Sequence, residues 1–149
     1  MTQFEPWMYQ RMVDDSPIAV IVADPEGVIR FWNAAATEVF GFTQSEALDQ
    51  TLDLIVPEPQ RARHWAGYQN VMQTGQTRYG RQQLAVPAMR KDGSRISVEF
   101  HVVLLHDDAE RLVGIAALLR DVTHRWQRER ALTQRVRELE AKLVEGQET

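Results

Sequence analysis

The sequence predicts an α+β fold, in which one antiparallel sheet carries short helices on one face and a helix stands at each end of the chain. Three observations predict it. Two strand-like segments precede residue 33, three longer ones follow residue 76, and short helical segments fill the interval. Sequential strands joined by turns most simply form one antiparallel sheet, with the helices over one face. The length of 149 residues suits one domain with a helical extension.

The composition excludes several classes of function and site. The formal net charge of −4 argues against a nucleic-acid partner, which usually selects a basic face. The chain has no cysteine, which excludes disulfides, thiolate nucleophiles, cysteine-ligated zinc and a flavin–cysteinyl photoadduct. No apolar run reaches the roughly 20 residues of a membrane span, and the N-terminus lacks a signal-peptide pattern. We therefore expect a cytoplasmic protein with no membrane contact. No motif for a catalytic site is present, so we expect no enzyme activity.

The first 15 residues predict an amphipathic helix. Phe4, Trp7, Met8 and Met12 recur every three or four positions, and Pro17 follows soon after. The apolar face of this helix has to be covered, either by its own domain or by a second subunit.

Residues 18–23 and 28–32 predict a β-hairpin. The first segment is apolar and β-branched, and Asp24-Pro25-Glu26-Gly27 lies between the two. Proline presets φ and glycine supplies a positive φ, so this tetrapeptide favours a turn. Asn33 is a good N-cap for a helix over 34–40 that Gly41 closes.

Two further helical segments follow. Thr43 and Glu46 form a capping box for a short helix, and the apolar residues 52–56 read as an irregular segment across the core. A longer helix is predicted from Pro57 to about residue 73, ending at Gly75. One stripe of that helix consists of Arg61, His64, Trp65, Tyr68, Val71 and Met72.

Three strands are predicted over 77–87, 96–104 and 112–120. In the middle one, apolar residues alternate with Ser97, Glu99 and His101, as in a half-buried strand. Turn residues at 90–94 and 107–110 separate the three segments.

The last segment predicts a helix from residue 121 to about 145. Leu132, Val136, Leu139 and Leu143 are spaced four, three and four, which fits a heptad seam. Extended backwards, the seam meets Glu129 and Arg125, so a coiled coil would be firmer at the far end. Isolated helices are marginal in water. We therefore expect a homodimer through the N- and C-terminal helices, with parallel packing of the latter.

Six short motifs occur together and in order along the chain. They are Ser16-Pro17-Ile18-Ala19-Val20, Asp24-Pro25-Glu26-Gly27, Trp32-Asn33-Ala34-Ala35, Phe40-Gly41-Phe42, Arg90-Lys91-Asp92-Gly93-Ser94 and Arg120-Asp121-Val122-Thr123. Over about residues 16–123 the chain resembles the PAS family of sensor domains. The resemblance implies a five-stranded antiparallel sheet around a ligand cavity, dimerisation through the terminal helices, and output through the last helix to a partner such as a histidine kinase or cyclase. We divide the chain into an N-terminal helix (1–15), a PAS sensor domain (16–122) and a signalling helix (123–149).

The segment from Val56 to His64 is also similar to the region around the proximal histidine in haem-carrying PAS domains of rhizobial oxygen-sensor kinases. This resemblance implies His64 as the ligand of haem iron, Arg81 as a distal hydrogen-bond donor to bound oxygen, and Phe100 and Val102 as the distal wall. The sequence departs from that pattern at Asn70, where haem-carrying members place an arginine. The alternative is a packed helix histidine that is hydrogen-bonded to a neighbour.

The expected ligand cavity lies between the sheet and the helix that carries His64, Trp65 and Tyr68. Its sheet face is expected to consist of Ile21, Phe31, Phe100, Val102, Ile115 and Ala117. Trp32 and Trp65 could stack on a planar ligand, or could simply fill the core. Three functions remain open: a ligand-sensing dimeric module, a haem-based gas sensor, and a ligand-free interaction module.

Overall fold

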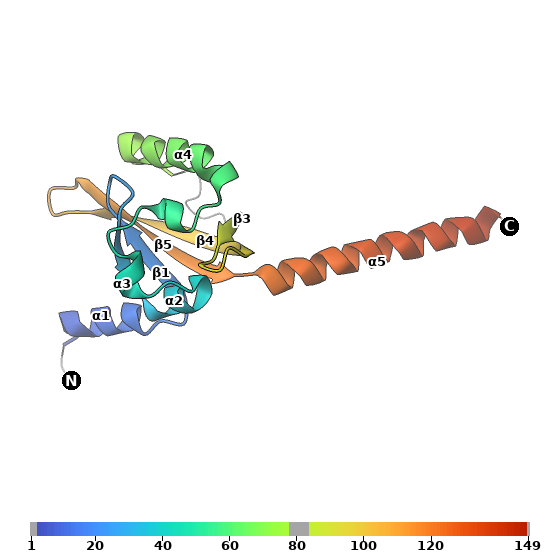
Figure 1. The fold of residues 1–149 in the computed structure, drawn as a ribbon, viewed down its shortest axis with the longest axis horizontal. Coiled ribbons are helices and arrows are strands. Elements are labelled where there is room, and N and C mark those ends of the chain that lie inside the picture. Colours follow the sequence, from blue (N-terminus) through green and yellow to red (C-terminus); the bar gives the residue numbers. More distant parts are fainter. Residues whose placement is uncertain (1–2, 78–83, 149) are drawn as a thin grey trace.

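A computed structural model describes residues 3–77 and 84–148 of the chain. A five-stranded sheet and its covering helices form the body, and one long helix, α5, projects from it as a rod (Figure 1). The predicted α+β class is therefore confirmed.

The sheet is antiparallel and has the strand order β2-β1-β5-β4-β3. The last strand of the chain thus lies at the centre of the sheet and beside the first. The strands are β1 (Ala19–Ala23), β2 (Ile29–Trp32), β3 (Leu84–Met89), β4 (Arg95–His106) and β5 (Leu112–Asp121). The strand predicted over 77–87 lies partly outside the described residues.

The helices occur where they were predicted, but α5 begins at Thr123 because β5 extends to Asp121, and the fourth helix also begins later than predicted. They are α1 (Pro6–Asp14), α2 (Ala34–Phe40), α3 (Gln44–Ala47), α4 (Arg61–Thr74) and α5 (Thr123–Glu148), with 3₁₀ turns η1 (Leu52–Leu54) and η2 (Glu58–Gln60). The helix expected from Pro57 is divided into η2 and α4. The first turn is 3₁₀, closed by the Gln60 N–H that donates to the Pro57 carbonyl oxygen at 2.9 Å, and the α-helix begins at Arg61.

The register of the strands shows which side chains share the inner face of the sheet. Ile21 lies opposite Trp32 on one side and Ala117 on the other, and Ala117 lies opposite Val102. Directly opposed residues point to the same face, so these four side chains line the core. The expected strand over 96–104 alternates as predicted, with Ile96 and Val98 buried.

Phe31 does not belong to the inner face, contrary to the expectation. It lies opposite Val22, on the outer face, whereas Trp32 is only 1% exposed and points inward. A β-bulge between Val22 and Ala23 leaves Arg30 as an extra residue in β2. Because the side-chain period of a strand is two, one extra residue changes the face of every residue on one side of it.

Asn33 connects three elements from inside the core, where it is 3% exposed. Its Oδ1 accepts hydrogen bonds from the backbone N–H of Ala36 (3.0 Å) and of Val20 (2.9 Å). Its Nδ2 donates to the carbonyl oxygens of Val13 (2.9 Å) and Ile18 (3.0 Å). Asn33, the predicted cap of α2, thus also holds β1 and the end of α1. These structural bonds explain an asparagine at this position, with no need for a ligand contact.

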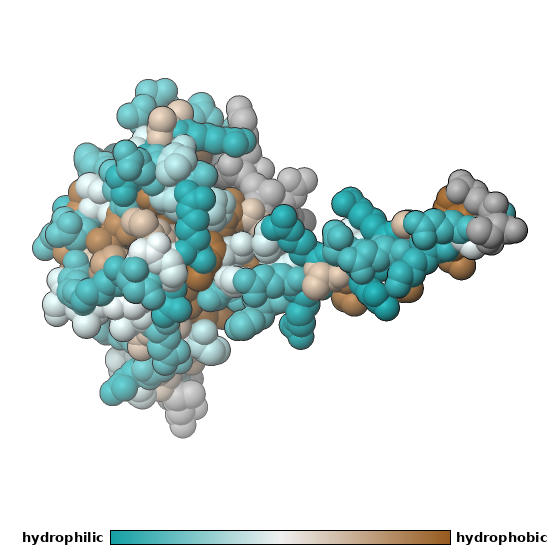
Figure 2. Space-filling view, turned by 45° about the vertical axis from the view of Figure 1, so that its right-hand side comes forward, coloured by the Kyte–Doolittle hydropathy of each residue, from teal (hydrophilic) through white to brown (hydrophobic). Residues whose placement is uncertain are grey.

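The two terminal helices keep apolar side chains exposed. None of the described α1 residues is buried, and Phe4 and Trp7 are exposed while Met8 is half-buried. On α5, Leu132, Val136, Leu139 and Leu143 are between 45% and 68% exposed. Figure 2 shows apolar surface along one side of the projecting helix. The pairing of these helices with a second copy stays a prediction.

Candidate ligand-binding site

Three aromatic side chains of α4 form one cluster. The ring of His64 meets the ring of Trp65 edge-on, with centroids 4.8 Å apart, and lies 5.9 Å from the ring of Tyr68. The Trp65 and Tyr68 rings are 5.6 Å apart. The predicted stripe of α4 therefore brings His64, Trp65 and Tyr68 together.

The α4 cluster packs on one end of the inner sheet face. Tyr68 is buried together with Ala23 and Ile115, which lie opposite each other on β1 and β5. Other apolar side chains complete this packing: Leu52, Trp65, Val71, Met72, Val102 and Leu104. Val102 and Ile115, which were expected to line a ligand cavity, thus pack in the α4 cluster, and the apolar side chains of this cluster occupy the space between helix and sheet.

Phe100 lies farther along β4 and packs in the main core cluster with Ala117 and Ile21. It is opposite Leu119 on β5. Val102 and Phe100 thus face the same side of the sheet but contact different clusters. Arg81, the expected distal donor, lies outside the described residues.

Tyr68 fastens α4 to the turn between β1 and β2. Its hydroxyl donates a 2.5 Å hydrogen bond to the carbonyl oxygen of Asp24, 44 residues away in the sequence. Burial, with the negative charges of Asp24 and Glu26 nearby, raises the pKa of the Tyr68 hydroxyl well above its usual value. The hydroxyl therefore stays protonated and remains a donor at physiological pH.

The Asp24 carboxylate stabilises the turn between β1 and β2. It accepts hydrogen bonds from the backbone N–H groups of Glu26 and Val28, both at 3.0 Å, and from the Arg30 guanidinium. Burial opposes ionisation here, but the hydrogen bonds from Val28 and Arg30 lower the pKa of Asp24 on balance. These hydrogen bonds thus fix the conformation of the turn to which Tyr68 of α4 is bonded.

The Tyr68→Phe substitution should therefore destabilise the fold by about 1 kcal/mol, since it removes one hydrogen bond and leaves the Asp24 carbonyl without this donor. Urea unfolding measures the change. Tyr9→Phe is the matched control, because Tyr9 is exposed on α1 and should leave stability unchanged. Equal stability of the wild type and Tyr68→Phe would show that the hydroxyl contributes nothing.

Trp65 provides a second attachment of α4. Its Nε1 donates a 2.7 Å hydrogen bond to Asp53 Oδ1, in η1. Its ring covers Gly27, where an added Cβ would lie only 2.2 Å from the ring. Gly27 also has φ of +81°. Sequence reasoning found the turn role of Gly27 but missed this contact, since nothing local marks it.

His64 carries the most unusual polar atom of the site. Its Nδ1 is buried and has no hydrogen-bond partner among the described residues. Burial lowers the pKa of His64, and the nearby Asp53 carboxylate only partly offsets this. At neutral pH the side chain is therefore a neutral imidazole, the form that binds metals. The expected hydrogen bond to a neighbour is not formed by this nitrogen.

Trp32 is a core residue and no part of the site. It packs against Phe40 and Phe42. Its Nε1 donates to Thr37 Oγ1 at 3.0 Å and to the carbonyl oxygen of Phe42 at 3.2 Å. Of the two tryptophans considered for stacking, only Trp65 lies beside His64.

The family model for the PAS fold matches residues 8–122, which is more than half of the chain. The chain belongs to the PAS family. PAS domains are in general sensory modules, and this one has the five-stranded antiparallel sheet that the family resemblance implied.

Two curated relatives are sensor proteins. The chain is 27% identical to the sensor protein FixL of Bradyrhizobium diazoefficiens, over 86% of this chain and 24% of FixL. It is 28% identical to the oxygen sensor protein DosP of Escherichia coli, over 80% of this chain and 14% of DosP. The chain thus spans less than a quarter of the length of these relatives.

Among solved structures, a PAS domain from Colwellia psychrerythraea superimposes with a TM-score of 0.69 at 19% identity, covering 79% of this chain and 97% of that domain. This likeness supports the fold.

Among the described residues of this PAS domain, no three His, Asp or Glu side chains gather as a metal site. No helix in the same part of the chain combines the length and apolarity of a membrane span.

Proposed function

We propose that this PAS domain is a sensory module in which the α4 cluster responds to a small ligand and α5 passes the response to a signalling partner. The observation that carries the proposal is His64 Nδ1, a buried polar atom without a partner in the described part of the chain. A buried polar group without a partner is costly. A site that retains one is a candidate for ligand binding.

The connection from the cluster to α5 runs along β5. Ile115 contributes to the α4 cluster, and the same strand ends at Asp121, directly before α5. The first turn of α5 is held by Ser97 of β4, whose N–H donates to Thr123 Oγ1 and whose carbonyl accepts from Val122 N–H. A shift of the sheet near the cluster therefore reaches the base of α5.

The signalling form that we propose is a homodimer with parallel α5 helices and α1 at its side. The exposed residues Leu132, Val136, Leu139 and Leu143 would form the seam. In a parallel pair, Arg135 and Glu140 of the second copy occupy the flanking g and e positions and attract each other. A ligand shifts this assembly only if it binds one dimer geometry more tightly than another.

Haem is the ligand class that the chemistry of the site favours. The neutral imidazole of His64 could hold the iron. Val102, Leu104 and Met72 fill the space beside it, so they would have to move apart to give a macrocycle apolar surface. Bound haem would supply an iron centre for a diatomic gas. The chain's own residues would exclude water and keep His64 neutral, while Tyr68 and Trp65 hold α4 in place.

The test is the absorption spectrum of the full chain expressed with haem available. We expect a Soret band, and we expect His64→Ala to abolish it because the iron loses its ligand. His124→Ala, which changes an exposed histidine on α5, is the matched control and should keep the band. A band of unchanged strength in His64→Ala would remove His64 as the ligand.

A ligand-free interaction module is the second candidate. The observation in its favour is that the chain's own apolar side chains occupy the space between α4 and the sheet. If haem leaves no Soret band and a panel of planar ligands raises no melting temperature, this second function would replace the first.

A further inference from the structure

The apolar seam of α5 continues towards the domain as a charged stripe. Counting back from Leu132 in heptad spacing leads to Glu129 and then to Arg125, at the positions that a and d residues occupy. One face of α5 is thus apolar far from the sheet and charged at its base.

The sheet of the same chain occupies this face at the base. The Arg125 guanidinium donates to the carboxylate of Glu99, on the outer face of β4. Glu99 is only 14% exposed, whereas Arg125 is 50% exposed. The Arg125 Nε also lies 3.8 Å from Glu129 Oε1 on its own helix. A partner helix that followed the seam to the domain would therefore compete with Glu99 for Arg125.

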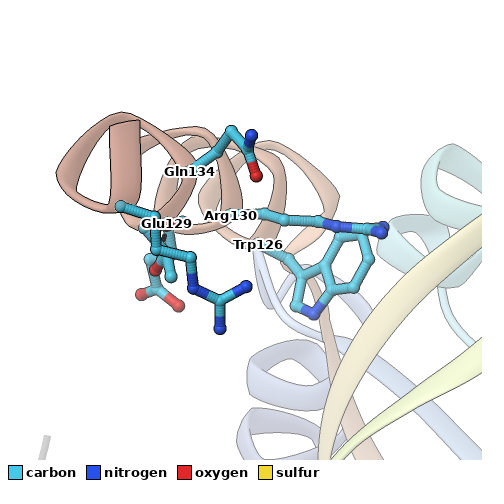
Figure 3. Close-up of a pocket in the computed structure, with 6 residues that line it drawn as sticks. Trp126, Glu129, Arg130 and Gln134 are labelled. Atoms are coloured by element: carbon cyan, nitrogen blue, oxygen red, sulfur yellow. Dashed lines mark hydrogen bonds between the residues drawn. The ribbon is translucent and has the colours of Figure 1, made fainter. Parts of the chain in front are cut away.

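A neighbouring contact involves another cation near the base of α5. The Arg130 guanidinium lies over the Trp126 ring, 5.0 Å from its centroid (Figure 3). Arg130 thus stacks on Trp126, whereas Arg125 is the cation that pairs with Glu99.

Arg125 has two alternative acidic partners. In a parallel pair, a d side chain enters a hole that includes an a residue of the facing helix. Arg125 of one copy would thus meet Glu129 of the second copy. The choice lies between Glu99 in its own sheet and Glu129 across the seam.

We propose that the Glu99–Arg125 ion pair is a clamp that decides where the paired α5 helices begin. With the clamp closed, pairing starts at Leu132; with the clamp open, Arg125 joins Glu129 of the second copy and pairing extends to the domain. This rests on the α5 pairing in the proposed function. Glu99 precedes Phe100 and Val102 on β4, so a change at the inner sheet face reaches the clamp through one strand.

The test measures the distance between helices at the base and at the tip. The chain has no cysteine, so single cysteines at Gln127 and Ala141, both opposite the seam, can carry nitroxide labels one at a time. Double electron–electron resonance then reports each distance in the full chain. In Glu99→Gln we expect the close population at residue 127 to rise by a factor of about 1.4 to 5, the range that ion pairs at a protein surface contribute. The distribution at residue 141 should not change.

Two further variants sharpen the result. Glu38→Gln removes one exposed acid from α2 and should match the wild type. The exchange Glu99→Arg with Arg125→Glu keeps the clamp but places two acids, at positions 125 and 129, against each other across the seam. It should leave the helices at residue 127 as far apart as in the wild type, or farther.

The two possible failures are distinguishable. The clamp would be overturned if the two copies show a defined distance at residue 141 but Glu99→Gln leaves the distances at residue 127 unchanged. The α5 pairing would then remain supported. The absence of any distance between copies at residue 141 would overturn the pairing, and the clamp with it.

Discussion

Gly27→Ala is expected to be among the most destabilising single changes in this PAS domain. The positive φ of +81° should cost about 1–2 kcal/mol for a residue with a Cβ. The Cβ would also lie 2.2 Å from the Trp65 ring, and overpacking of this kind costs a further 1–3 kcal/mol or so. Urea unfolding measures the sum, and the tryptophan fluorescence of the folded state reports displacement of Trp65.

Gly93→Ala is the matched control for this prediction. Gly93 has φ of +85°, but no atom lies within 4 Å of the position of its added Cβ. It should show the backbone cost alone. The difference between the two variants is therefore the cost of displacing Trp65.

A double-mutant cycle tests that assignment. In a Trp65→Ala background the ring is gone, so Gly27→Ala should cost no more than Gly93→Ala. If Gly27→Ala costs as much without the ring as with it, the contact between the turn and α4 has no energetic role.

Asn33→Ala should have a comparable effect, a loss of about 3 kcal/mol or more. The change removes the cap of α2 and leaves the Val20 N–H and the carbonyl oxygens of Val13 and Ile18 without this partner. The Asn33 side chain is buried, so water does not readily replace the lost bonds. Urea unfolding measures the loss, and hydrogen exchange should show faster opening at the end of α1.

Two variants separate the causes. Asn70→Ala, at an exposed position of α4, should change stability by less than about 0.5 kcal/mol. Asn33→Asp keeps the acceptor oxygen but loses the two donor bonds, so it should remain destabilised. An Asn33→Asp protein as stable as the wild type would mean that the bonds to Val13 and Ile18 do not matter.

Most elements of the fold could be predicted because their signals are local. The Asn33 cap, the Gly41 end and the Thr43–Glu46 capping box are all present in the structure. The seam of α5 and the alternation along β4 depend only on the period of each element. Such patterns place helices and strands without knowledge of what packs on them.

Two predictions were partly wrong: the start of α4 and the inward position of Phe31. The first turn of the predicted helix is 3₁₀, so α4 begins only at Arg61, and the bulge at Arg30 places Phe31 on the outer face and Trp32 on the inner one. Neither a bulge nor a 3₁₀ turn has a strong local signature. Their positions depend on how the strand and helix meet the rest of the core.

By itself, the sequence determined the class of fold, the family, the helix that carries His64 and the apolar stripe of α5. Only the tertiary structure decided what these residues contact: Tyr68 on the Asp24 carbonyl, Trp65 over Gly27, His64 Nδ1 without a described partner, and Arg125 on Glu99. The reason is physical. Periodicity and capping act within a few residues, whereas each of these contacts joins groups 26 or more residues apart or depends on how distant segments bury one atom.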